Sequence, residues 1–286
     1  MSVVKDRLSV TAYPLWLASP LALAMLLFFI APLLMLGVVS FYSDAAMTQW
    51  GSGANWSKMF DAFGFMVLGD TLWLGVQVTV LSLILGFGLA WVFVRLPAKI
   101  QPFIIFIVML PLLTSVVVRT FAWIVILGKQ GIVNNMLIDL GWIEAPLKLL
   151  YTRTGLVIAL ANVQLPLMVL PLITALQRID LNLSDASASL GASEWQTFKK
   201  VTIPLSLPGI IAGCLLTFSA AITAFISQSL IGGGQMLFMP MYLYQQVSAL
   251  SNFPFAAAIS LTFLATVVLC VSVFNLLGRL SRGYAV

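Results

Sequence analysis

Apolar residues occupy six long runs along the chain, and short polar segments separate them. The runs cover about residues 17–42, 71–94, 102–127, 155–176, 207–231 and 255–278. Each run has at least 22 residues, and about 20 apolar residues suffice for a helix to cross the hydrocarbon core of a bilayer. The pattern predicts an all-α integral membrane protein with six transmembrane helices, forming a single domain over residues 1–286.

The first run follows two basic residues, Lys5 and Arg7, as the apolar segment of a signal peptide does. It extends over about residues 17–42, however, whereas the apolar part of a signal peptide has only about 7–15 residues. We therefore interpret this run as a membrane span that stays in the protein.

Basic residues are distributed unequally between the two sets of connections. With the amino terminus inside, the inner set contains nine of them and the outer set four. The inner residues are Lys5, Arg7, Arg95, Lys99, Arg178, Lys199, Lys200, Arg279 and Arg282, and the outer residues are Lys58, Lys129, Lys148 and Arg153. Because cytoplasmic loops carry the excess of Lys and Arg, we expect both termini in the cytoplasm.

The composition excludes several other classes of protein. Hydrophobic residues make up 61% of the chain and charged residues 8%, whereas a soluble domain carries about 25% charged residues. Lipid is therefore the expected partner, and nucleic acid is not. The chain has no histidine, and Cys214 and Cys270 lie within apolar runs, so we expect neither a metal site nor a disulfide. The sequence G-x-x-x-x-G-K-[ST] does not occur, so we expect no cofactor and no ATPase site in this chain.

The connection formed by residues 177–206 is the longest one on the inner side, and it predicts two short helices joined by a bend. Ser184 is suited to cap a first helix over about residues 185–190. Gly191 is suited to end that helix in a left-handed conformation.

The second helix of this connection is predicted from its own signals. Ser193 starts it, and Gln196 three residues later completes a capping box. Pro204 and Pro208 are expected to stop it and to mark the return into lipid.

The surface of this connection suits contact with another protein. Small side chains at residues 186–189 permit close approach, and Leu190, Trp195 and Phe198 supply apolar anchors. From the residues alone, a docking element for a cytoplasmic partner and a solvated linker both remain open.

The spacing of the connection resembles the Glu-Ala-Ala loop of binding-protein-dependent ABC importer permeases. Residues 185–187 read Asp-Ala-Ser, Gly191 follows after three residues, and residues 201–204 read Val-Thr-Ile-Pro after nine more. The family has Glu-Ala-Ala, three residues, Gly, nine residues and Ile-x-Leu-Pro. There the loop is the coupling helix, which sits in a groove of the ATP-binding subunit. The resemblance implies an ATPase-coupling role for Asp185, Ala186, Ser187, Leu190, Gly191, Ala192, Trp195 and Pro204.

Three further segments resemble the first permease type of the spermidine/putrescine branch of this family. They are TSVVVRTFAW at 114–123, LGASEWQTFKKVTIPLSLPGIIAG at 190–213 and FPFAAAISL at 253–261. The resemblance implies a type I importer fold in the bacterial inner membrane. It also implies a second homologous permease, a dimer of ATP-binding subunits that carry ATP and Mg, and a periplasmic substrate-binding protein. Substrates of the branch include spermidine and putrescine, other small organic ions and metals.

Polar residues at membrane depth are candidates for contact with a transported solute. The candidates are Arg119, Trp123, Asn162, Gln164, Ser227, Gln228 and Ser229. Arg119 has two interpretations. It pairs with a substrate carboxylate or phosphate, or stacks on Trp123 one turn later; or it is structural, paired with a backbone carbonyl or a loop carboxylate or extended outward to the membrane surface. The other residues either line the path or form hydrogen bonds between helices.

One absence bears on the substrate. A polycation needs carboxylates along its route, yet no Asp or Glu lies deep in any predicted span. Polyamine permeases carry an acid near the end of the fifth span, where this sequence has Ser229. Together with Arg119, this departure favours a substrate with an anionic or zwitterionic group.

The sequence therefore predicts the permease subunit of an ATP-driven importer of a small organic solute, either polyamine-like or otherwise charged or zwitterionic. A separate ATPase is coupled to it through residues 185–204. The alternative is a stand-alone secondary transporter, which would carry an inverted repeat, and no such repeat is visible. A membrane-embedded enzyme would need a catalytic group of His, paired carboxylates or Ser–Lys at depth, and the spans contain none.

Overall fold

The computed structural model describes residues 19–282, and in this range the regular structure is helical apart from an isolated bridge between Tyr42 and Trp50. The basic residues Lys5 and Arg7 of the orientation argument lie outside the described residues. Six helical stretches are long and apolar enough to cross a membrane. They are Ser19–Ser40, Ala62–Arg95, Val116–Asp139, Arg153–Leu176, Glu194–Ile222 and Phe253–Leu276.

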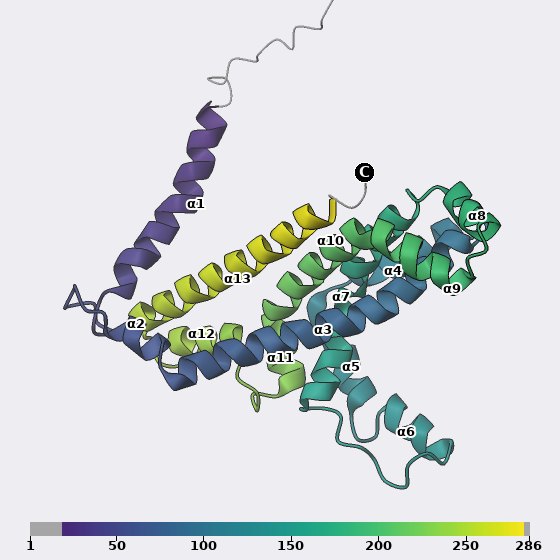
Figure 1. The fold of residues 1–286 in the computed structure, drawn as a ribbon. Coiled ribbons are helices and arrows are strands. Elements are labelled where there is room, and N and C mark those ends of the chain that lie inside the picture. Colours follow the sequence, from purple (N-terminus) through teal and green to yellow (C-terminus); the bar gives the residue numbers. More distant parts are fainter. Residues whose placement is uncertain (1–18, 283–286) are drawn as a thin grey trace, which may run out of the picture.

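The helices follow one another along the chain as in Figure 1. They are α1 (Ser19–Ser40), α2 (Ala54–Met59), α3 (Ala62–Arg95), α4 (Gln101–Leu113), α5 (Val116–Leu127), α6 (Ile132–Asp139), α7 (Arg153–Leu176), α8 (Leu181–Ser189), α9 (Glu194–Thr197), a π-helical turn η2 (Phe198–Thr202), α10 (Ile203–Ile222), α11 (Phe225–Gly232), α12 (Met239–Ser248) and α13 (Phe253–Arg282).

The core of the bundle lies where α3, α7 and α10 pack against one another. Glycines allow these helices to approach closely, because an added Cβ would meet a neighbouring helix. At Gly75 it would lie 2.5 Å from Ile222 Cγ2, and at Gly213 it would lie 2.7 Å from Met168 Sδ. The small residues therefore fix the spacing of the central helices.

Helix α1 stands apart from the rest of the bundle. It contacts α13 near α2, and its other end points away from the bundle (Figure 1). Ser40 is the buried residue of this helix, while its many leucines, methionines and phenylalanines are exposed. An apolar helix with such exposure must be covered by lipid or protein in the membrane.

The third predicted span, residues 102–127, is not one helix, and the prediction was wrong on this point. Helix α4 ends at Leu113, Thr114 is extended with φ −100° and ψ 150°, and α5 begins at Val116. The hydroxyl of Thr114 donates to the carbonyl of Pro111 at 3.0 Å. A local side-chain bond of this kind competes with the helix ladder, while the apolar sequence continues unchanged across the break.

The fifth predicted span, residues 207–231, is also broken. Helix α10 ends at Ile222 and α11 begins at Phe225. The side-chain amide of Gln228 donates to the carbonyls of Ala221 at 2.9 Å and Ile222 at 3.3 Å. These bonds satisfy carbonyls that the end of α10 leaves open, so the break is stabilised inside the bundle.

The inner connection has the predicted bend, but its boundaries differ from the prediction. The first helix begins at Leu181 and is capped by Asp180, whose carboxylate accepts from the N–H of Asn182. It is not capped by Ser184, because Asp180 offers the same kind of acceptor earlier in the chain.

Neither proline stops the second helix. Helix α9 continues through η2 into α10, with Pro204 at the start of α10 and Pro208 inside it. A proline ring clashes with the carbonyl four residues earlier in a regular helix. The wider turn of a π-helix just before Pro204 changes this register, so the chain passes into the bundle without a stop.

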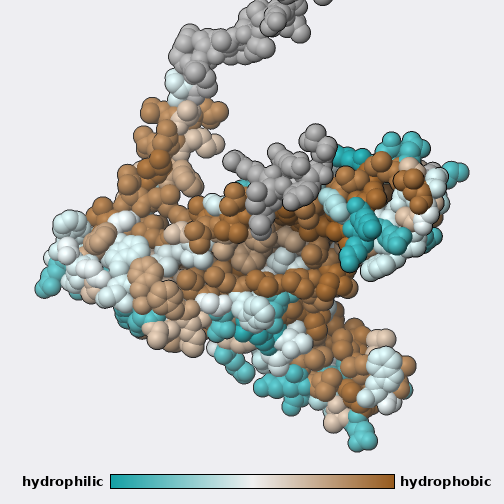
Figure 2. Space-filling model, in the orientation of Figure 1, coloured by the Kyte–Doolittle hydropathy of each residue, from teal (hydrophilic) through white to brown (hydrophobic). Residues whose placement is uncertain are grey.

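Hydrophilic residues gather at the ends of the molecule. Figure 2 shows them around α8 and α9, around α2, along the lower face near α11 and beyond α6, while hydrophobic surface covers much of the long helices. This distribution is the one that a bundle surrounded by lipid requires.

Candidate coupling element and membrane path

The bend between α8 and α9 is built from local signals. Gly191 has φ +81°, and the N–H groups of Gly191 and Ala192 donate to the carbonyls of Ala188 and Ser187. This is the pattern that ends a helix with a left-handed glycine. The capping box of Ser193 and Gln196 is present at the start of α9. The predicted helix–bend–helix geometry is thus confirmed.

A side-chain hydrogen bond closes the bend. Ser187 Oγ lies 2.8 Å from Thr197 Oγ1, which joins α8 to α9 across ten residues. The side chain of Asp185 lies outside the described residues, although its backbone belongs to α8. The segment from Leu181 to Thr197, called the coupling element below, therefore has two helices held at a fixed angle.

Two large apolar side chains of the coupling element are mostly exposed. Leu190 is 89% exposed and Trp195 is 69% exposed. Ala186 is exposed as well, whereas Ala192 is half-buried and lines a cavity of about 410 Å³ beside α3. An exposed apolar patch on a short, rigid element is typical of a contact with another protein.

An aromatic cluster, which the sequence analysis missed, attaches the coupling element to α3. Trp195 stacks on Phe198, and the ring of Phe198 meets the rings of Trp91 and Phe87 edge to face. Phe87, Trp91 and Arg95 are spaced by four residues each and so share one face of α3. This spacing was the signal in the sequence that could have identified the cluster.

The candidate path residues fall into two groups in the structure, and the first group is bound within the protein. Arg119 Nη1 donates to the backbone carbonyl of Val163 at 3.4 Å, as the structural interpretation of this residue expects. Ser227 Oγ lies 3.0 Å from Thr120 Oγ1, which joins α11 to α5. Gln228 is buried and bonds the end of α10. These bonds join α5 to α7 and α11, and they join α11 to the end of α10.

The second group is open to the outside of this chain. Asn162 is exposed on α7, and Gln164 and Ser229 are half-buried. Trp123 is partly buried and packs against the core around α7. The side chain of Asn162 lies one residue from Val163, the hydrogen-bond partner of Arg119. The structure therefore places Arg119 against the backbone of α7 at Val163, directly after the exposed Asn162 in the chain.

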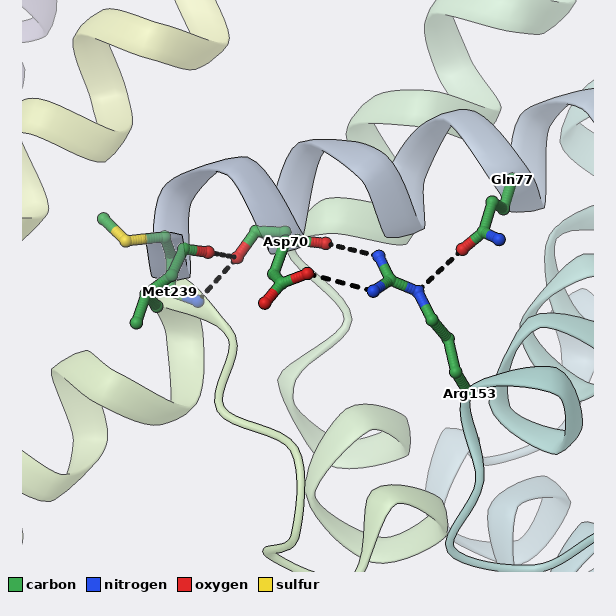
Figure 3. Close-up of polar contacts among 6 residues, drawn as sticks. Asp70, Gln77, Arg153 and Met239 are labelled. Atoms are coloured by element: carbon green, nitrogen blue, oxygen red, sulfur yellow. Dashed lines mark hydrogen bonds and ion pairs between the residues drawn. The ribbon is translucent and has the colours of Figure 1, made fainter. Parts of the chain in front are cut away.

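A polar clamp joins α3 to α7 at the end of the bundle opposite the coupling element (Figure 3). Arg153 Nη1 lies 2.9 Å from Asp70 Oδ1, Nη2 donates to the Asp70 carbonyl at 3.1 Å, and Nε donates to Gln77 Oε1 at 2.8 Å. Asp70 does not cap α3, because Asp61 does so two turns earlier. Sequence reasoning missed this pair, since its partners are 83 residues apart.

Comparison with known proteins identifies the family. Residues 82–285 match the family described as "Binding-protein-dependent transport system inner membrane component", which is more than half of the chain. The chain belongs to this family.

Relatives of this binding-protein-dependent permease include the spermidine/putrescine transport system permease protein PotB of Escherichia coli (strain K12). It is 34% identical over 226 residues, which cover 79% of this chain and 82% of the relative. The inner membrane ABC transporter permease protein YdcU of the same organism is 32% identical over 284 residues and 90% of each chain. The molybdenum transport system permease protein ModB is 29% identical over 231 residues.

Solved structures give the fold of this permease. A bacterial ABC transporter involved in the import of the acidic polysaccharide alginate matches with a TM-score of 0.75 and 19% identity, over 93% of this chain and 96% of the other. A bacterial alginate ABC transporter in complex with an alginate pentasaccharide-bound periplasmic protein also matches, with a TM-score of 0.75 and 18% identity over 93% of this chain and 94% of the other. The permease thus has the type I ABC importer fold and is a multi-pass membrane protein.

Proposed function

We propose that this permease moves a small charged or zwitterionic organic solute across the bacterial inner membrane, with ATP hydrolysed by a separate subunit. The observation that carries the proposal is the coupling element, a rigid pair of helices with Leu190 and Trp195 exposed on a protein of this family. When a groove of a partner protein covers an exposed apolar side chain, its removal from water is favourable. Burial of one leucine contributes about 1.5–3 kcal/mol to the binding free energy.

The proposed assembly contains this chain, a second homologous permease, two ATP-binding subunits with ATP and Mg, and a periplasmic substrate-binding protein. Both termini and the coupling element face the cytoplasm in this arrangement. The excess of basic residues on that side supports the orientation. A solved relative of this fold in complex with a periplasmic protein supports the binding-protein partner.

The proposed contact with the ATPase comprises Asp185, Ala186, Ser187, Leu190, Gly191, Ala192, Trp195 and Pro204. Within this set Leu190 and Trp195 are the anchors, because they are large, apolar and exposed. Gly191 sets the angle between the two helices, and Pro204 lies where the chain enters α10.

The docking proposal is tested with Leu190→Glu in the chain co-expressed with its cognate ATPase. We expect the amount of co-purified ATPase to fall by more than about tenfold, because a buried leucine contact of about 1.5–3 kcal/mol is lost and a charge is placed in the interface. Uptake should fall in parallel. The control is Leu140→Glu, since Leu140 precedes a left-handed glycine at the end of α6 as Leu190 does at the end of α8. Equal ATPase binding by Leu190→Glu and wild type would contradict the proposal.

The solute is proposed to pass α7 and α11, where Asn162, Gln164 and Ser229 are the candidate path residues that are not buried. Arg119 and Trp123 of α5 complete the proposed set. Ser227 and Gln228 support this surface from within, through their bonds to α5 and α10.

The path proposal predicts different effects for the open and the bound residues. Asn162→Leu should raise the KM for uptake about threefold to tenfold, because one hydrogen bond to the solute is lost, and leave ATPase binding unchanged. Ser227→Ala should instead lower the thermal stability in detergent and leave KM unchanged. The first probes are radiolabelled putrescine and a zwitterionic amino acid, measured in vesicles with the complete assembly. An unchanged KM in Asn162→Leu for a transported probe would exclude Asn162 from the path.

A further inference from the structure

The coupling element touches the membrane helices through aromatic rings. Trp195 stacks on Phe198 with ring centroids 5.5 Å apart and an interplanar angle of 22°. Phe198 meets Trp91 edge to face at 4.8 Å and 83°, and Phe87 at 5.7 Å and 83°. A push on the exposed ring of Trp195 therefore reaches α3 after a single intervening ring, in geometries that aromatic pairs prefer.

The receiving ring on α3 is fixed from its other side. The guanidinium of Arg95 lies 3.3 Å from the centroid of the Trp91 ring, and its Nη1 donates to the Trp91 carbonyl at 3.2 Å. Trp91 also stacks on Phe87 at 6.4 Å and 20°. Arg95, Phe87 and Phe198 therefore contact the indole from three directions, so a displacement of the Phe198 ring acts directly on a side chain of α3.

Helix α3 can carry this movement across the membrane. It has 34 residues without a proline or a break, which corresponds to about 51 Å at 1.5 Å per residue. Its far end holds Arg153 of α7 through Asp70 and Gln77, and the hydroxyl of Thr71 accepts the N–H of Met239 of α12 at 2.9 Å (Figure 3). One continuous helix thus links the aromatic cluster to the ends of two other helices.

The coupling element is also connected along the chain to α10, and this connection is less regular than α3. The coupling element enters α10 through the π-helical turn η2, Phe198–Thr202, and the span that α10 begins is broken again after Ile222. A π-helical turn interrupts the regular ladder and is frequent at positions that move in function. Phe198 is the first residue of this turn, directly after α9, so movement of the coupling element reaches its ring before the rest of the turn can absorb it in part.

We propose that α3 is the lever of this importer, with Phe198 and Trp91 as the positioning residues that pass movement of the coupling element to the far ends of α7 and α12. The proposal rests on the proposed function, because it assumes that an ATPase moves the coupling element. The ring contact between Phe198 and Trp91 transmits this movement, but the ATPase binds without it.

The test follows the far end of α3 in the complete assembly reconstituted in lipid nanodiscs. A reporter cysteine is introduced by Gly69→Cys, where an added Cβ meets no atom within 4 Å, in a background with Cys214→Ala and Cys270→Ala. Its rate of reaction with a membrane-impermeant maleimide is measured with and without Mg-ATP. We expect Mg-ATP to change this rate in the parent assembly. Phe198→Leu and Trp91→Leu should each shrink the ratio of the two rates by up to about tenfold, equal to about 1.4 kcal/mol.

Three controls separate transmission from folding. Phe198→Tyr keeps the ring and should keep the response. Phe274→Leu removes a different aromatic pair, Phe218 with Phe274 at 5.7 Å. This variant should also keep the response of the reaction rate to Mg-ATP. The double variant of Phe198 and Trp91 should lose no more than either single variant, because both remove the same contact. If Phe198→Leu itself weakens ATPase binding, Trp91→Leu is the decisive variant, since Phe198 directly follows the coupling element whereas Trp91 lies on α3.

The outcomes distinguish this proposal from the proposed function. A parent assembly that binds the ATPase, with Leu variants that respond to Mg-ATP as the parent does, overturns the lever and leaves the proposed function intact. The lever proposal is also overturned if the parent assembly binds the ATPase but Mg-ATP leaves the maleimide reaction rate at residue 69 unchanged. A parent that binds no ATPase overturns the proposed function itself.

Discussion

Gly191→Pro is expected to abolish ATP-driven uptake while the membrane helices stay folded. Gly191 has φ +81°, and proline is held near φ −65°. The substitution also removes the N–H that donates to the Ala188 carbonyl at 2.9 Å. The bend between α8 and α9 must then open, at a cost of about 3 kcal/mol or more, and the coupling surface loses its shape.

The measurement is the amount of cognate ATPase that co-purifies with the chain, together with uptake in vesicles. Gly141→Pro is a close control, because Gly141 has φ +69° and its N–H donates to the Ile138 carbonyl at 2.9 Å. It imposes the same backbone change on the segment after α6. We expect it to retain ATPase binding, so a loss in both variants would show that the effect is one of general stability.

Gly209→Val is expected to lower the stability of the bundle by about 2–3 kcal/mol, within the range of overpacked cores. An added Cβ at Gly209 would collide with the Cβ of Ala175 and lie 2.8 Å from the carbonyl oxygen of Pro171. A backbone carbonyl cannot move aside as a flexible side chain can. Helix α10 would have to separate from α7, and the packing of both would suffer.

The thermal midpoint of the purified chain in detergent measures this effect. Gly69→Val serves as the control, because Gly69 lies in the exposed part of α3 with no atom within 4 Å of an added Cβ. Replacing an exposed helix glycine removes an entropic cost of about 0.5–1 kcal/mol, so the midpoint should stay unchanged or rise. An unchanged midpoint in Gly209→Val would contradict the close contact of α7 and α10.

The broken spans show where hydropathy stops being informative. Residues 102–127 and 207–231 are apolar throughout, and the sequence analysis therefore took each as one helix. The structure breaks them at Thr114 and Thr223, and Thr120 and Ser227 join the two pieces that follow the breaks. A bilayer tolerates such breaks only where neighbouring protein groups satisfy the freed backbone, and those neighbours are distant in sequence.

In the candidate site, too, the sequence predicted which residues matter, but the packing decided what they contact. Arg119 was predicted at membrane depth, but only the packing of α5 against α7 places it on the Val163 carbonyl. Phe198 was predicted as an apolar anchor for a partner, whereas the structure turns its ring towards Trp91. Which face of a short helix meets the bundle depends on the path of the chain through η2, and a capping pattern does not encode that path.

The sequence by itself determined the membrane class, the approximate extents of α1 and α7 and the bend at Gly191. These features depend on apolar run length, on caps and on the conformation of single residues, all of which act within a few positions of the chain. Only the tertiary structure decided where spans break, which ring contacts α3 and how Arg153 clamps Asp70. Those features depend on pairs such as Arg153 and Asp70, 83 residues apart, whose interaction exists only after the helices have packed.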